Sequence, residues 1–281
     1  MLIRLFAALV LLSSPVLRLQ PPVVAAEIAV QGFPISAMMR ATALDQVFTQ
    51  FGTAIAEVAR NEDIAANRTF LKHWDATAQA MFDADAMHRR LALTLEGKFS
   101  ADEQAVLGTF FRSELGRRVT GLERDAALLP PAGQLSAITL GEAIDAAADA
   151  VRSKQLAALL TLVSAEISAD MLGQSLRAVL LGLSISHQHG DIDVPWSEID
   201  AQVDAMLPEL TTSVQHTQRD LMAYAYRNLT DAELDRYIAF LGTAPAQKFY
   251  ALATRAIGRI VTDTMSAFGD AFASRMASVD I

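Results

Sequence analysis

Apolar residues recur at spacings of three and four along most of the chain, which is the pattern of amphipathic helices. Over residues 35–60 they fall on one helical face, and we expect one helix there. The same spacing continues over residues 64–97 as one or two helices, with Gly97 at the position that typically follows a helix end. No segment after Glu27 alternates with the period-two pattern of a strand. The pattern predicts an all-α fold.

A short pattern occurs twice, 130 residues apart and with the same internal spacing. The first copy is Phe99-Ser100-Ala101-Asp102-Glu103, then Phe110, Ser113 and Arg117-Arg118; the second is Leu229-Thr230-Asp231-Ala232-Glu233, then Phe240, Thr243 and Gln247-Lys248. Each copy has the capping-box spacing at the start of a helix, and a second hydroxyl residue where another helix can begin. Each therefore predicts a helix, a tight turn and a closing helix, the latter over residues 114–129 and 244–274. A self-similar period indicates an internal duplication.

The two halves meet at a proline-rich segment. Residues 129–133 contain Pro130, Pro131 and Gly133, and neither proline continues a preceding helix. We therefore expect a first helical repeat over residues 27–133 and a second over residues 134–281.

Two further signals divide the second repeat. Thr139 and Glu142 match the capping-box spacing, which predicts the first helix start of that repeat. Helices are expected from residue 140 to about 185 with a break near Ser164, and again after Ser197. Pro208 predicts a kink or a break in that last stretch.

The N-terminus has the features of a secretory signal. Arg4 precedes an apolar run, and Val24 and Ala26 supply the small residues that signal peptidase needs before the cleaved bond. We expect residues 1–26 to be removed, leaving a periplasmic or secreted protein. The alternative is an uncleaved membrane anchor, which requires about 20 uninterrupted apolar residues. Pro15 and Arg18 interrupt this segment, so we expect no stable membrane span after cleavage.

Composition narrows the range of functions. The chain has no cysteine, which excludes disulfides, thiol nucleophiles and thiolate metal sites. It carries 32 acidic and 23 basic residues, for a net charge of −9. An acidic protein repels nucleic-acid phosphates, so we expect no nucleic-acid partner.

The paired pattern resembles the bacterial secreted family catalogued as domain of unknown function 2059. The matching stretches are residues 99–118 and 229–248, about 20 residues in each half. The first copy lacks the proline that this family usually places after the Ser/Thr, and the second copy lacks the glycine. The resemblance implies an exported helical protein, and it supplies no catalytic residues.

One loop has the residue types of a metal site. His187, His189, Asp191 and Asp193 offer two imidazoles and two carboxylates at short spacing, which could bind zinc, manganese or copper. The alternative is a solvated loop between helices, since Gly190 and polar residues are typical of loops. We favour the loop and predict no metal or other cofactor.

The charged residues of the repeated pattern also have two interpretations. Glu103 and Glu233 could converge as a carboxylate pair for acid–base work, although their capping-box position already explains them. The basic residues Arg117, Arg118 and Lys248 could contact an anionic partner or form intramolecular ion pairs. The chain lacks a Gly-x-Ser-x-Gly elbow, a phosphate-binding loop and a His-Glu-x-x-His motif.

The sequence therefore favours an exported, non-catalytic helical protein that binds a protein or a component of the cell envelope. One alternative is a carrier of an apolar small molecule or lipid in an interhelical cavity. Another is a metal-dependent enzyme that uses the His187 loop.

Overall fold

The computed structural model describes residues 33–49, 51–53, 55–56, 68–164 and 196–277. This part of the chain contains helices and no strand, so the prediction of an all-α fold is confirmed. The helices are α2 (Ile35–Ala41), α4 (Arg68–Met81), α5 (Ala84–Leu95), α6 (Ala101–Arg112), α7 (Glu114–Ala127), α8 (Pro131–Ala146), α9 (Ala150–Ser164), α11 (Trp196–Ala225), α12 (Asp231–Leu241) and α13 (Ala244–Ala277). Among the described helices, none is long and apolar enough to cross a membrane.

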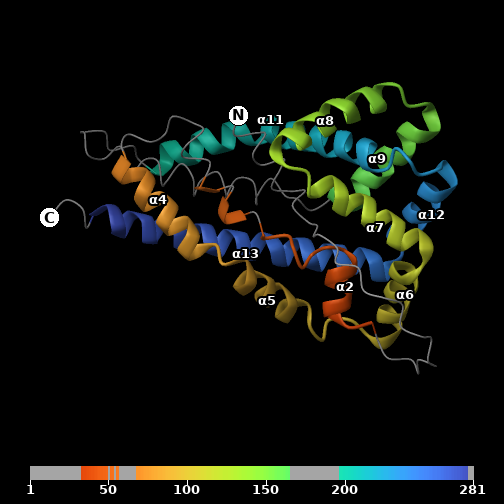
Figure 1. The fold of residues 1–281 in the computed structure, drawn as a ribbon, viewed down its shortest axis with the longest axis horizontal. Helices are drawn as coiled ribbons and strands as arrows, with labels where there is room; N and C mark the ends of the chain where they lie inside the picture. Colours follow the sequence, from red (N-terminus) through yellow and green to blue (C-terminus); the bar gives the residue numbers. More distant parts are fainter. Residues whose placement is uncertain (1–32, 50, 54, 57–67, 165–195, 278–281) are drawn as a thin grey trace.

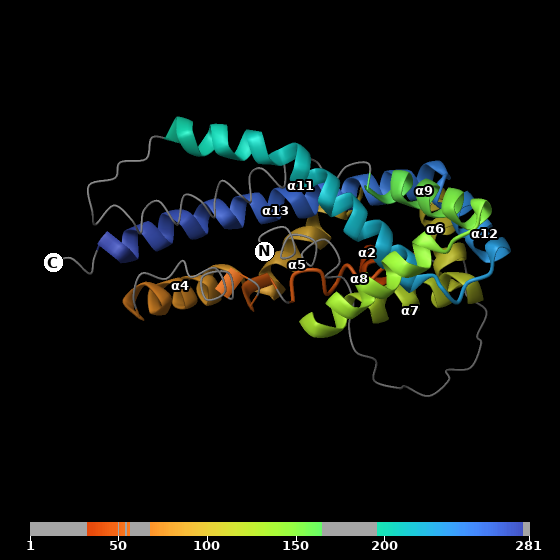
Figure 2. The same cartoon turned by 90° about the horizontal axis from the view of Figure 1, so that it is seen from above.

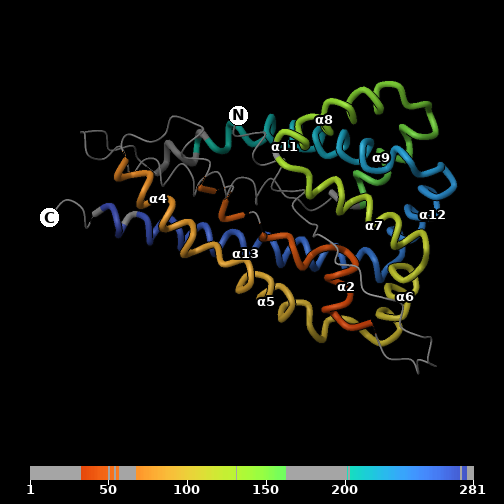
Figure 3. The backbone as a smooth tube through the Cα atoms, in the orientation of Figure 1, coloured from red at the N-terminus to blue at the C-terminus, as the bar shows by residue number. Residues whose placement is uncertain are grey.

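The longest helix, α13, runs the length of the molecule (Figure 1). Its C-terminal part lies along α4 and α5, and its N-terminal part reaches the end of the molecule that holds α6 and α12. In the view of Figure 2, α4 and α11 flank α13 on opposite sides. The path of the backbone in Figure 3 shows α8 lying along α11. These helices position the repeated pattern at one end of the molecule.

Two hydrophobic clusters form the core. The first joins α4 and α5 to the C-terminal part of α13, and its largest side chains include Trp74, Phe268 and Phe272. The Trp74 indole nitrogen donates a hydrogen bond of 2.8 Å to the carbonyl oxygen of Ile55, which satisfies the polar atom of this buried ring. The second cluster joins α6, α7, α9 and α12 to the N-terminal part of α13. Both clusters combine residues from either side of Gly133, so neither half has a core of its own among these residues.

The first predicted helix is shorter in the structure than its apolar pattern suggests. In the described part of the predicted range 35–60, the helix α2 is followed by turns at residues 42–49, and residues 51–53 and 55–56 are helical. The Thr42 hydroxyl bonds to the carbonyl oxygen of Met38, and Ala43 follows with a positive φ of 57°. A left-handed residue ends a helix, so the prediction of one continuous helix was wrong.

The start of the second half also differs from the prediction. The helix α8 begins at Pro131, inside the segment that was predicted to be a linker, and Thr139 lies within the helix and caps nothing. The Thr139 hydroxyl donates to the carbonyl oxygen of Leu135, one turn earlier. Proline is favoured in a first helical turn because its missing N–H group would have no partner there, so Pro131 begins the helix eight residues before the capping-box match.

The other helix boundaries depend on short local signals. Residues 64–97 contain two helices, α4 and α5, and Asp83 caps the second by accepting from the backbone N–H groups of Asp85 and Ala86. Gly97 has a positive φ of 69° after α5, as predicted. The described part of α9 runs to Ser164, and the turn between α8 and α9 was not predicted. Pro208 lies inside α11, which continues on both sides of it.

Candidate functional site

The repeated pattern forms the helix starts that its spacing predicts. In the first copy, the Glu103 N–H group donates to the Ser100 hydroxyl over 3.2 Å, and the Ser100 N–H group donates to the Glu103 carboxylate over 2.8 Å. Thr230 and Glu233 form the same capping box with distances of 3.3 and 2.8 Å. Ser113 caps α7 through the Gly116 N–H group, as predicted. Both predicted capping boxes are therefore confirmed.

The two copies contact each other, and we call the contact between residues 99–118 and 229–248 the junction. Lys248 of the second copy bonds both carboxylate oxygens of Glu103 in the first copy at 2.8 Å. In return, Arg118 of the first copy bonds the carboxylate of Glu233 and the carbonyl oxygen of Asn228, the latter at 2.7 Å. Each copy thus supplies the cation that binds the capping-box glutamate of the other copy.

An aromatic stack lies at the centre of the junction. The rings of Phe110 and Phe240 are nearly parallel, with their centroids 3.7 Å apart. Tyr237 stacks on Phe110 at 5.8 Å, and Phe111 meets Phe240 edge to face at 5.4 Å. Aromatic contacts of this kind stabilise a fold beyond the burial of their apolar area. The junction is therefore stabilised both by the aromatic stack and by the two ion pairs between the copies.

The ion pairs decide what the two glutamates can do chemically. The Lys248 ammonium is the largest influence that holds the pKa of Glu103 below its ordinary value. The Thr230 N–H group, the helix cap, is the largest influence that lowers the pKa of Glu233. A lowered pKa keeps a carboxylate ionised and makes it a weak proton acceptor. The structure places each glutamate against a cation, and this geometry favours a structural role for both.

A second polar cluster lies beside the junction and joins two buried tyrosines to a half-buried carboxylate. The hydroxyls of Tyr226 and Tyr237 both donate to the same oxygen of Glu123, over 2.6 and 2.7 Å. Burial raises the pKa of Glu123, and the two hydrogen bonds oppose that shift. Burial also raises the pKa of both tyrosines well above the ordinary value. The cluster fastens α7 to the end of α11 and to α12 by hydrogen bonds in a poorly hydrated environment.

The positions 130 residues away do not repeat this polar cluster. Glu123 corresponds to Ala253 and Tyr237 corresponds to Leu107, and both of these counterparts are buried and apolar. Burying a carboxylate costs free energy that an alanine does not cost. The two copies of the pattern therefore differ in this polar cluster. Glu123 is the acid in the cluster that could have a functional role.

Sequence reasoning missed Glu123, although one signal for it was present. Val119 and Ala127 lie four residues before and after Glu123, so all three share a helical face, and both neighbours are buried. An acid in the middle of an apolar stripe indicates a buried carboxylate. Its partners could not be deduced, because the tyrosines lie more than 100 residues away.

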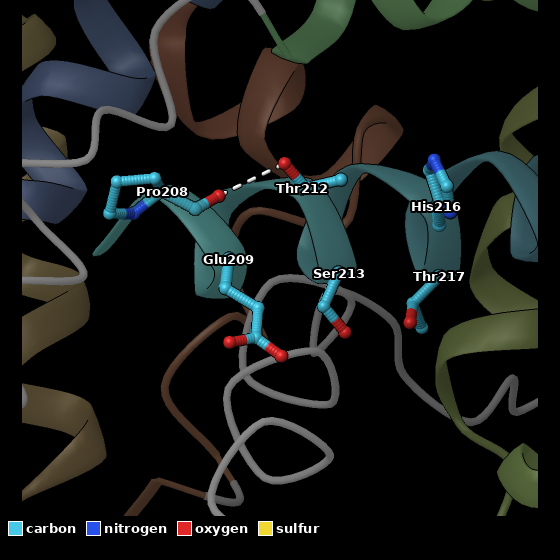
Figure 4. A pocket seen from close by; sticks show the side chains of 6 residues that line it. All are labelled: Pro208, Glu209, Thr212, Ser213, His216 and Thr217. Carbon is cyan, nitrogen blue, oxygen red and sulfur yellow. Dashed lines mark hydrogen bonds between the residues drawn. The ribbon is translucent and has the colours of Figure 1, made fainter. Parts of the chain in front are cut away.

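A recess of about 570 Å³ lies along α11 (Figure 4). The described residues that line it are Pro208, Glu209, Thr212, Ser213, His216 and Thr217. The Thr212 hydroxyl bonds to the carbonyl oxygen of Pro208 in its own helix, over 2.9 Å. The lining thus offers hydroxyls, a carboxylate and an imidazole, which are groups that suit polar ligands more than lipids.

The residues of the proposed metal loop, His187, His189, Asp191 and Asp193, lie outside the described residues, as does the predicted signal at residues 1–26. Within the described ranges, no group of three or more His, Asp or Glu side chains is placed to hold a metal ion. Of the three basic residues considered above, Arg118 and Lys248 form the exchanged ion pairs. Arg117 donates to the carbonyl oxygen of Arg112. These contacts use the basic residues within the chain.

The described fold and the junction define an all-α protein in which two similar helix–turn–helix segments bind each other crosswise. Comparisons of the whole chain with protein-family models, with curated proteins and with solved structures found no match.

Proposed function

We propose that the chain is an exported helical binding protein that acts on a protein partner or an envelope component without catalysing a reaction. The crosswise ion pairs carry this proposal, because the acids of the repeated pattern are used to hold helices together. Residues 1–26 have the composition of a cleaved signal, and the resemblance of the repeated pattern to an exported helical family supports the same localisation.

The recess on α11 favours a polar partner. Its hydroxyls and its imidazole can form hydrogen bonds with peptide groups or with sugars, whereas an apolar carrier needs a cavity lined by apolar side chains. Within each hydrophobic cluster, bulky side chains pack against one another. Trp74 contacts Phe268 in the first cluster, and Phe110 contacts Phe240 in the second. We therefore place binding to a polar partner ahead of lipid transport.

Export is tested by the mass of the protein recovered outside the cytoplasm. We expect a mature form that begins at Glu27. Ala26→Phe should block cleavage, because signal peptidase needs a small residue immediately before the cut. Ala25→Phe is the matched control, since the position between the two small residues tolerates bulk. A wild-type protein that keeps residues 1–26 and stays in the cytoplasm would contradict export.

Binding is tested by photo-crosslinking in the native host. A photoreactive amino acid replaces Ser213 or Thr217 in the recess and, as a control, the exposed Thr94 on α5. We expect a discrete adduct from the recess positions that Thr94 does not give. Identical adducts from all three positions would argue against a partner at this surface. A reaction catalysed by the pure protein and abolished in Glu123→Gln would overturn the non-catalytic proposal.

A further inference from the structure

The helix α8 is attached to the molecule through a face of small residues and through Ile144, which packs against the second hydrophobic cluster. Of all the described helix pairs, α8 and α11 make the most extensive contact. Among the residues of α8 whose burial is described, however, only Ala137 and Gly141 are fully buried. These two residues are four apart, so they lie on one face. Two residues this small remove little apolar area from water, so polar contacts, together with the packing of Ile144, help to decide how firmly α8 docks.

The backbones of α8 and α11 approach closely at Gly141. A Cβ atom at this position would lie 1.9 Å from the carbonyl oxygen of Asp220, which no side chain can tolerate. The docking of α8 therefore places its middle turn directly against Asp220.

One ion pair fastens the end of α8. Arg219 donates from Nε and Nη2 to the two carboxylate oxygens of Asp145, over 2.6 and 2.8 Å. The same guanidinium reaches the Ser153 hydroxyl of α9 at 3.0 Å. This planar two-bond geometry is the strong form of an ion pair, and both partners are largely buried, with about one fifth of each side chain exposed.

Asp220 lies next to this ion pair, among both acidic and basic side chains. Glu142 and Asp145 face it from α8 and repel its charge, while His216 and Arg219 of its own helix attract it. On α9, Arg152 is directed to Asp231 and Leu229, and on α7, Glu123 is bound to two tyrosines. Burial and the two carboxylates prevail, and they raise the pKa of Asp220 to about 6.

We propose that α8 is an acid-closed arm, docked on α11 while Asp220 is protonated and loosened when Asp220 ionises. A neutral Asp220 allows Glu142 and Asp145 to lie beside it without repulsion. An ionised Asp220 adds a third carboxylate at this contact, and its repulsion by Glu142 and Asp145 weakens the docking of α8. A raised folded-state pKa stabilises the docked form at low pH, and that stability is lost as the pH rises through about 6. This inference is independent of the proposed function.

Hydrogen exchange of the full chain, followed by mass spectrometry and corrected for the intrinsic effect of pH, tests the arm. Between about pH 5 and pH 7.5, we expect the protection of the α8 amides to fall by about tenfold, the effect of about one pKa unit. The amides of α7 should keep their protection. Asp220→Asn should keep α8 protected at both pH values, because its side chain cannot ionise.

Two further variants separate docking from general stability. Gly141→Ala should leave α8 unprotected at both pH values, whereas Gly121→Ala in α7, where an added Cβ meets no atom within 4 Å, should behave as the wild type. Glu142→Gln should move the transition to lower pH by removing one repelling charge. Equal protection of α8 at both pH values in the wild type would overturn the proposal. So would the same loss in Asp220→Asn.

Discussion

The rings of Phe110 and Phe240 stack face to face, with centroids 3.7 Å apart and planes inclined by 6°. The two residues occupy the same place in the two copies of the pattern, 130 residues apart. Around them, each copy gives a cation and receives one, so the contact is self-complementary in the manner of a symmetric dimer interface. A duplicated unit that packs against its own copy would produce this arrangement, and the duplication itself stays a prediction.

The stack predicts a measurable coupling between its two rings. Phe240→Ala should lower the free energy of unfolding by about 3 kcal/mol, because this ring is buried. In a double-mutant cycle with Phe110→Ala, the coupling should be about 1 kcal/mol. The control cycle pairs Phe110→Ala with Phe272→Ala, since Phe272 belongs to the other hydrophobic cluster. A Phe110–Phe240 coupling no larger than in the control would show that the stack adds nothing beyond burial.

The exchanged ion pair of Glu103 and Lys248 predicts sensitivity to acid. The Glu103 pKa is lowered in the folded state, so its stabilising effect is complete above the ordinary value of 4.5 and is lost as the pH falls below it. Glu103→Gln keeps a side chain that can cap the helix but removes the charge. Its urea denaturation should depend less on pH below about 4.5 than that of the wild type. Lys248→Gln should have the same effect, and the two changes together should add little, because either one removes the pair.

Local features of the fold could be predicted from the sequence because they depend on residues within one helical turn. The capping boxes at Ser100 and Thr230 and the positive φ at Gly97 are of this kind. The third match, at Thr139, failed because Pro131 begins the helix earlier, and a residue inside a helix has no free N–H group to cap. A local signal is decisive only where no stronger one precedes it.

The candidate site could not be predicted because its contacts span the chain. The acid Glu123 was visible on an apolar face, but its buried partners Tyr226 and Tyr237 depend on how α11 and α12 pack. The exchange of cations between the copies also requires the two halves to interlock, as the shared hydrophobic clusters show. The spacing of the pattern predicts the helices, but it does not predict that the cation of each copy binds the glutamate of the other copy.

Ionisation of Glu123 should lower the stability of the fold, and Glu123→Gln should remove this effect. The Glu123 pKa is raised in the folded state, so stability is complete below the ordinary value of 4.5 and declines as the pH rises. The glutamine can still accept both tyrosine hydrogen bonds through its amide oxygen. Measured by urea denaturation, the variant should therefore gain stability over the wild type as the pH increases. The exposed Glu209→Gln is the control, and parallel pH curves for all three proteins would exclude a buried charge.

The tyrosines of the cluster predict a second effect. Tyr226→Phe and Tyr237→Phe should each lower the free energy of unfolding by about 2 kcal/mol, which is typical of a hydrogen bond to a charged group. The two losses should not be additive, because both hydroxyls donate to the same Glu123 oxygen. Tyr224→Phe, two residues before Tyr226, is the control. Losses equal to that of the control would mean that the two bonds contribute no net stability.

The hydrogen bond between Phe48 and His88 predicts that the segment around Phe48 loosens in acid. The His88 Nε2 atom accepts the Phe48 N–H group over 3.2 Å, which requires a neutral imidazole because a protonated ring has no acceptor. Burial lowers the His88 pKa, against the opposing influence of Asp45 and Asp85. The stability from this contact is therefore complete above the ordinary value of 6.5 and is lost as the pH falls through the lowered one.

The measurement is hydrogen exchange of residues 42–49, corrected for the intrinsic effect of pH. Protection in the wild type should fall in acid, while His88→Gln, whose amide oxygen can accept at any pH, should stay protected. His73→Gln on α4 is the matched control and should behave as the wild type. If His88→Gln loses protection in acid to the same extent, the loosening arises elsewhere, because the imidazole is then not the group whose protonation breaks the contact with Phe48.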